Sequence, residues 1–102
     1  MAHFGRTLER LRTQAGFATA YAYYHRNGGR RVFPFSFSYY RKIERGLSLP
    51  KAAWLPVLVH NLRLLTPMEG SQALTKALLS DLVGDEAVFR DFVEPLFIPA
   101  PS

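Results

Sequence analysis

Positively charged and hydroxyl-bearing side chains are concentrated in one short segment, residues 35–46 (FSFSYYRKIERG). Arg41, Lys42 and Arg45 within it are hydrogen-bond donors that carry a positive charge. Such donors bind phosphate oxygens, and they pair with the edge of guanine in the major groove of DNA. The segment therefore predicts recognition of a nucleic acid.

The same segment carries the start, stop and core signals of a short helix. Ser36 is a suitable N-cap, because its hydroxyl oxygen accepts hydrogen bonds from free backbone N–H groups. Gly46 can adopt the left-handed conformation that ends a helix. Phe35, Tyr40 and Ile43 fall close to one face and are expected to pack into the core. A helix with a packed back and a basic front is an element that the major groove admits.

The front of this helix, expected over residues 36–45, supplies most of the candidate DNA contacts. Arg41 and Lys42 suit guanine edges, and Ser38 suits either base type. Phe37 could contact the methyl group of a thymine. The candidate residues on the helix, including those better placed for phosphates, are Ser36, Phe37, Ser38, Tyr39, Arg41, Lys42 and Arg45.

Charge is distributed unevenly along the 102 residues, which carry a net charge of +5. Residues 1–65 contain eleven Lys or Arg against two Glu, a net +9, whereas residues 66–102 contain two against six acidic residues, a net −4. A basic module of this kind suits a polyanionic partner. The alternative is a solvated basic surface without a partner.

Several other classes of function are disfavoured. With no Cys, the chain can form neither a disulfide nor a thiolate metal site, and its three His are scattered without helical metal spacing. No set of residues assembles a nucleophile, a base and an orienting group, so we expect no enzymatic activity and no cofactor. The longest apolar run, residues 52–59, is too short to span a bilayer, and no signal-peptide pattern is visible. We expect a cytoplasmic protein without a membrane partner.

Apolar periodicity and capping signals predict an all-α chain. Asn27, Gly28 and Gly29 indicate a turn, and residues 30–33 could form a brief strand or a small hairpin before Pro34. Pro56 falls inside a predicted helix. It should either kink this helix or move the start of the helix to a later residue. The expected helices cover approximately residues 3–14, 18–25, 36–45, 50–64, 67–82 and 85–93.

The order of these motifs resembles the lambda-repressor and Cro-like helix-turn-helix family over about residues 4–65. The recognition helix of that family typically ends in Ile-x-x-Ile-Glu-x-Gly, matched here at Tyr40, Ile43, Glu44 and Gly46. The motif of Leu11, Arg12, Gly16 and Phe17 is similar to the first helix of the family and its exit. The resemblance implies a compact helix-turn-helix bundle of about four helices, with one or two C-terminal helices added.

The resemblance also implies roles for single residues. A Gln at the start of the second family helix commonly binds a phosphate, and Thr19 is the residue here that could do so. Glu44 would be a structural carboxylate paired with Arg10 or Arg12. The spacing from Gly16 to Phe35 is 19 residues, about seven more than is usual in the family.

The extra residues form a basic loop over 26–34, inserted between the two motif helices. Arg30 and Arg31 in this loop could reach an adjacent minor groove or the DNA backbone. The domain organisation expected is then a DNA-binding-like domain over residues 1–65 and an acidic helical extension over 66–102.

Apolar residues of the extension could fold back on the N-terminal helices or form a homodimer interface through residues 66–98. Family members commonly dimerise through elements after their fourth helix, and we favour the homodimer. Dimers read two half-sites in DNA.

The leading functional hypothesis is a sequence-specific, DNA-binding transcriptional regulator that binds double-stranded DNA, with no cofactor. The alternative is a protein-interaction module that retains the fold without specific DNA binding. A third hypothesis is binding of RNA or single-stranded DNA through tyrosines and arginines.

Some of these side chains also have structural explanations. Tyr40 is expected in the core, because it occupies the apolar position of the pattern. Phe37 is equally consistent with packing against Phe33 under the loop. Trp54 is expected in the core or at an interface.

Overall fold

The protein is all-α, as predicted, in a computed structural model that describes residues 3–62, 67–84, 87, 90–91 and 95. No strand is present in these residues, and no helix among them is long and apolar enough to cross a membrane. The helix predicted over 85–93 and the residues after it fall largely outside the described part. The elements are α1 His3–Gln14, α2 Ala20–Arg26, the 3-10 helix η1 Gly29–Arg31, α3 Phe37–Glu44, the 3-10 helix η2 Ala52–Trp54, α4 Leu55–Leu62 and α5 Pro67–Val83.

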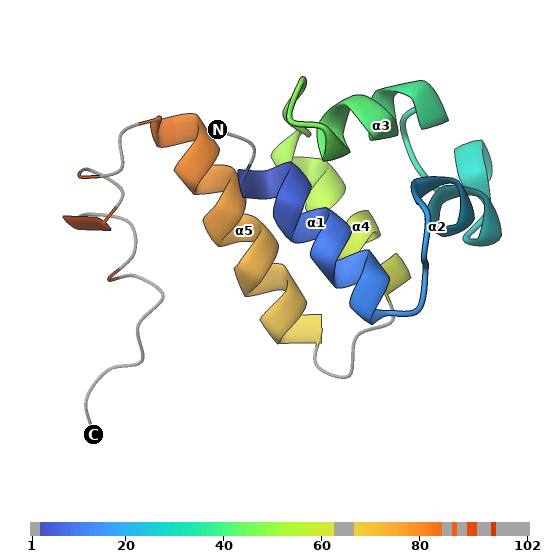
Figure 1. Ribbon diagram of the computed structural model, residues 1–102, viewed down its shortest axis with the longest axis horizontal. Helices are drawn as coiled ribbons and strands as arrows, with labels where there is room; N and C mark the ends of the chain where they lie inside the picture. Colours follow the sequence, from blue (N-terminus) through green and yellow to red (C-terminus); the bar gives the residue numbers. More distant parts are fainter. Residues whose placement is uncertain (1–2, 63–66, 85–86, 88–89, 92–94, 96–102) are drawn as a thin grey trace.

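Helix α1 is the central element of the bundle, with α5 alongside it and α3 across it (Figure 1). Its apolar face, Phe4, Leu8 and Leu11, is almost completely buried. The spacing of these residues at three and four positions is that of one helix face. The chain leaves α1 at Gly16, whose positive φ of 98° allows the sharp exit toward α2.

Helix α5 packs against α1 and α4, so the described part of the acidic extension belongs to the same core as the basic helices (Figure 1). Leu74, Ala77 and Leu78 are buried in that core. The sequence left two arrangements open for the extension, folding back on the N-terminal helices or forming a homodimer interface. Over α5 the structure shows the first of them. Leu82, near the end of α5, is 60% exposed.

Asp81 near the end of α5 caps the start of α1. Its carboxylate accepts hydrogen bonds from the backbone N–H groups of His3 at 3.1 Å and Phe4 at 2.8 Å. These N–H groups lack partners within the helix, and the N-terminal end of a helix attracts negative charge. Sequence reasoning missed this cap, because Asp81 follows Phe4 by 77 positions and His3 by 78.

We expect Asp81→Ala to lower the free energy of unfolding by about 1 kcal/mol, which is typical for the loss of a helix cap. For a domain of this size the melting temperature would fall by about 4–8 °C. Thermal unfolding followed by circular dichroism measures the effect. Asp91→Ala is the matched control, since the Asp91 side chain is 59% exposed and, among the described residues, is paired with its neighbour Arg90. Equal melting temperatures for Asp81→Ala and wild type would contradict the capping role.

The predicted strand or hairpin over residues 30–33 is wrong. Gly28 and Gly29 both have positive φ, 110° and 56°, and they turn the chain into η1. The N–H of Phe33 then donates to the Gly29 carbonyl at 2.8 Å, which closes a helical turn. The inserted loop is also only partly exposed, because Phe33 is 1% exposed in the core.

Two predicted helix boundaries also differ from the structure. Residues 50–64 do not form one helix, because the chain passes through η2 and α4 begins only at Leu55. Pro56 thereby lies in the first turn of α4, where its missing N–H has no helical partner to lose. Helix α2 begins at Ala20, two residues later than predicted, because the Thr19 hydroxyl accepts from Ala22 N at 3.0 Å and caps it.

Candidate nucleic-acid interface

The predicted basic helix is present as α3, with both of its end signals in use. The Ser36 hydroxyl accepts a hydrogen bond from the N–H of Tyr39 at 3.1 Å, as an N-cap. Gly46, after the last turn, has a positive φ of 78°. The helix is therefore fixed at both ends by local sequence.

The back of α3 is packed against aromatic rings of α2 and against Phe35, which precedes the N-cap. Tyr40 and Ile43 are 0% and 1% exposed, which confirms that Tyr40 belongs to the core. The Tyr40 ring lies 5.4 Å from that of Tyr23 and 6.2 Å from that of Phe35, between ring centres. Ring pairs at these separations add to the stabilisation from burial alone.

Burial changes the acidity of these tyrosines. Tyr23 donates its hydroxyl to the Leu58 carbonyl at 2.8 Å, whereas the Tyr40 hydroxyl has no hydrogen-bond partner among the residues that the structure describes. Loss of solvation raises the pKa of both hydroxyls far above the usual value, and the negative charge of Glu44 raises it further. Both rings are consequently neutral structural groups.

A buried ion pair attaches α3 to α1. Arg12 donates from Nε to Glu44 Oε2 at 3.0 Å and from Nη2 to Oε1 at 2.7 Å, and both side chains are 8% exposed. Arg12 Nη1 also donates to the Phe17 carbonyl at 2.9 Å. The hydrogen bonds to Glu44 raise the pKa of Arg12. Of the two partners predicted for Glu44, the structure selects Arg12, and Arg10 is exposed.

Gly5 permits the close approach of the two helices. A Cβ atom at this position would overlap the carbonyl oxygens of Ile43 and Glu44, which are backbone atoms and cannot move aside. The absence of a side chain on α1 therefore determines how closely the end of α3 approaches it. Together with the ion pair, this contact fixes the orientation of α3.

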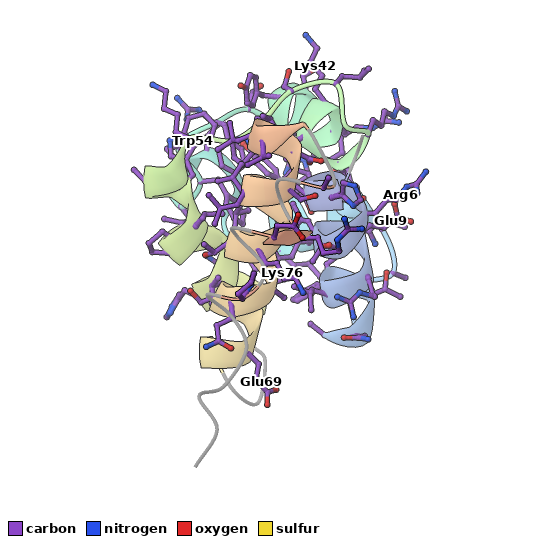
Figure 2. All side chains as sticks on the ribbon, turned by 90° about the vertical axis from the view of Figure 1, so that its left-hand side faces the viewer. Arg6, Glu9, Lys42, Trp54, Glu69 and Lys76 are labelled. Carbon is purple, nitrogen blue, oxygen red and sulfur yellow. The ribbon has the colours of Figure 1, made fainter. Side chains whose placement is uncertain are left out.

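The front of α3 exposes the basic residues that the sequence predicted. Ser38, Arg41, Lys42 and Arg45 are all exposed. Their side chains make no hydrogen bond or ion pair with any of the residues that the structure describes. Figure 2 shows Lys42 projecting away from the molecule. Two cations on α3 and a third at its C-cap, none of them ion-paired among the described residues, form a surface suited to an anionic partner.

Two aromatic candidates on α3 have internal partners. Tyr39 donates its hydroxyl to the Leu49 carbonyl at 3.3 Å, and its ring packs edge-on against Trp54 at 5.6 Å. Phe37 is half-buried against the rings of Tyr21, Tyr24 and His25, while Phe33 is not among its ring contacts. The ring partners of Phe37 are thus on α2 rather than in the loop.

The candidates outside α3 lie on η1 and at the start of α2. Arg30 and Arg31 are exposed on η1, which packs against α2, and Arg30 Nη1 donates to the Phe33 carbonyl at 3.2 Å. Thr19 is exposed at the start of α2 and uses its oxygen as the helix cap. Its hydroxyl proton remains available for donation to a phosphate.

Sequence reasoning missed the contribution of α1 to this surface. A shallow polar hollow lies where α1, α2 and α3 meet, with a volume of about 280 Å³. The Arg12–Glu44 pair is neutral overall, so Arg41 and Arg45 make the hollow basic and Glu9 opposes them. On the other side Glu9 lines a second hollow with Arg6 and Arg10, and Figure 2 shows Arg6 and Glu9 projecting together from α1. The residues lining the first hollow are Glu9, Arg12, Ala20, Arg41, Glu44 and Arg45.

Neither a metal centre nor a known relative indicates the function. The described residues contain no group of three or more His, Asp or Glu side chains that could hold a metal ion. Comparisons with protein-family models, with curated proteins and with solved structures found no match. The surface of α3 and the elements that hold it are therefore the features that indicate a function.

Proposed function

We propose that this protein binds double-stranded DNA and regulates transcription, with α3 in the major groove. The observation that carries the proposal is the division of α3 into two faces. Tyr40 and Ile43 fix one face in the core, while Arg41, Lys42 and Arg45 extend from the other without partners in the described residues. An α-helix fits the major groove, and Arg and Lys there can pair with guanine or phosphate oxygens.

The rigidity of the platform supports the proposal. Base recognition requires side chains that are held in one register, because a hydrogen bond is lost when its donor moves by a fraction of an ångström. The cap at Ser36, the Arg12–Glu44 pair and the contact at Gly5 each restrict α3. Thr19, Arg30, Arg31 and Arg45 would then contact phosphates on either side of the groove.

Dimerisation through the exposed side of α5, within residues 66–98, is part of the proposal, although Leu74, Ala77 and Leu78 are buried in the core of the same chain. Leu82 supports it, because this large apolar side chain at the end of α5 is 60% exposed. Two copies would place two α3 helices on successive turns of the duplex, and the DNA sequences selected by the protein would be palindromic.

A salt titration against random duplex DNA tests the function. We expect the logarithm of the binding constant to fall by about 0.9 per phosphate contact for each unit of log salt. Replacing both Arg41 and Lys42 by Ala should weaken binding by at least tenfold, or about 1.4 kcal/mol. Fluorescence anisotropy at several salt concentrations measures both effects.

The single variants Arg41→Ala and Lys42→Ala are compared with Arg10→Ala. Arg10 is also an exposed cation, but it lies on α1, outside the residues proposed to contact DNA or to form the dimer. Its replacement controls for the loss of one positive charge and should leave binding nearly unchanged. If wild-type protein shows no affinity for duplex DNA at low salt, the proposal is wrong.

One observation favours the protein-interaction alternative. Leu47 and Leu49, directly after α3, are 70% and 38% exposed, and apolar side chains gathered on a surface are typical of contacts with proteins. A partner held in this way would bind with little dependence on salt. The salt titration therefore distinguishes the two functions.

A further inference from the structure

Three rings form an exposed aromatic corner at the start of α3. Tyr21, which is 63% exposed, lies edge-on to Phe37 with 5.7 Å between ring centres. His25 lies 4.2 Å from Tyr21 and 5.3 Å from Phe37, again between ring centres. Tyr24 packs against Phe37 from the buried side at 5.5 Å. Phe37 is thus held in place while part of its apolar surface stays accessible.

Arg41 follows Phe37 by four residues and therefore lies on the same side of α3, one turn further on. Four residues correspond to about 6 Å along a helix axis, whereas successive bases of one strand are about 3.4 Å apart. The long arginine side chain can span the difference and reach the base next to the one that faces Phe37. Arg41 is exposed and has no partner among the described residues, so its guanidinium is available.

We propose that Phe37 and Tyr21 together bind the C5-methyl group of a pyrimidine whose neighbour is a guanine bound by Arg41. The Phe37 ring offers no hydrogen bond to a base, so the groove group that suits its accessible surface is apolar, and the pyrimidine methyl is that group. Arginine pairs in two-point fashion with guanine O6 and N7. The inference rests on the proposed function and names the base step that α3 reads.

Two bases carry the methyl group at the same position of the groove, thymine and 5-methylcytosine. We place the pyrimidine on the 5′ side of the guanine, so the step bound by Phe37 and Arg41 is TpG or methylated CpG, and binding assays with modified duplexes distinguish them. A methyl group buried between the rings contributes about fourfold in affinity.

The experiment begins with duplexes that the protein enriches from a random pool. Each enriched duplex is compared with a copy in which deoxyuridine replaces thymine, and with copies whose TpG step is changed to CpG, with and without methylation. We expect about fourfold weaker binding when the methyl group is absent. Phe37→Ala should remove this difference, whereas Phe37→Leu, which keeps an apolar side chain, should retain most of it. Helical circular dichroism and thermal unfolding verify that both variants fold.

The outcomes separate this inference from the proposed function. Salt-dependent duplex binding that is equal with and without the methyl group overturns the inference and leaves DNA binding in place. A methyl preference that persists in folded Phe37→Ala overturns it too, because another residue then reads the group. If no duplex is enriched at all, the proposed function fails and the inference fails with it. If the protein binds thymine duplexes more tightly than deoxyuridine duplexes but does not prefer methylated over unmethylated CpG, the step that it reads is TpG.

Discussion

Replacing Arg12 by Ala is expected to destabilise the protein by about 3 kcal/mol, because Glu44 would remain in the interior as an unpaired charge. The pair has two hydrogen bonds, at 2.7 and 3.0 Å, and each side chain is only 8% exposed. Small domains have total stabilities of about 5–15 kcal/mol, so this loss is a large fraction. Urea unfolding followed by circular dichroism measures it.

Two further variants separate the ion pair from other effects. Arg10→Ala removes an exposed cation from the same helix and should change stability by less than about 0.5 kcal/mol. The double variant Arg12→Met, Glu44→Leu removes both charges and should recover most of the stability, since an apolar pair can replace a buried ion pair. A loss below about 1 kcal/mol for Arg12→Ala would show that Glu44 finds another partner or water.

The pKa shift of Arg12 does not limit this stabilisation at ordinary pH. Its pKa is raised by the hydrogen bonds to Glu44. A raised pKa in the folded state gives stability that is complete below the pKa of the unfolded state and is lost only as pH rises further. Arginine is protonated up to about pH 12, so the contribution is constant across the physiological range.

The protein is expected to lose about 3 kcal/mol of stability at pH 11 through Tyr23 and Tyr40. Burial raises the pKa of both hydroxyls far above the usual value. Unfolded tyrosine ionises near pH 10, so above this pH the unfolded state releases protons that the folded state retains. The stability contributed is therefore complete below about pH 10 and falls as pH rises, by about 1.4 kcal/mol per tyrosine at pH 11.

Urea midpoints measured from neutral pH to pH 11 test this dependence. Tyr23→Phe should reduce its slope by roughly a third to a half, because one titrating group is removed, while Tyr40 and Tyr24, whose pKa burial also raises, remain. Tyrosinate absorbance should show that the rings of Tyr23 and Tyr40 ionise together with the loss of helical signal. Their ionisation in a protein that is still fully helical would contradict the assignment.

The local properties of α3 could be predicted from the sequence because short-range interactions determine them. Ser36 and Gly46 act within one turn of the helix ends. The burial of Tyr40 and Ile43 follows from their periodicity, which any packed helix must satisfy. The resemblance to a helix-turn-helix pattern likewise anticipated a carboxylate at Glu44 paired with α1.

Features that depend on tertiary packing were outside the reach of the sequence. Phe37 packs against Tyr21 and Tyr24, so its environment depends on the position of α2, which begins after the Thr19 cap. The turn at η1 requires two successive glycines with positive φ, which a chain uses equally well for a hairpin. Glu9 and Arg41 line the same hollow because α1 packs against α3, a contact between distant parts of the sequence.

The link between Asp81 and the start of α1 has a consequence for the order in which the chain can fold as it is synthesised. The first helix leaves the ribosome early, yet the carboxylate that caps it follows 77 positions later. Until then Leu8 and its neighbours lack the covering provided by α5, and the platform beneath α3 is incomplete. Contacts between such distant positions form slowly, because a long loop must close first. A nascent chain would therefore contain α3 well before α1 and α5 could hold it rigidly. The synthesis of α5, in the acidic part of the sequence, thus determines when the basic helix α3 acquires a rigid support.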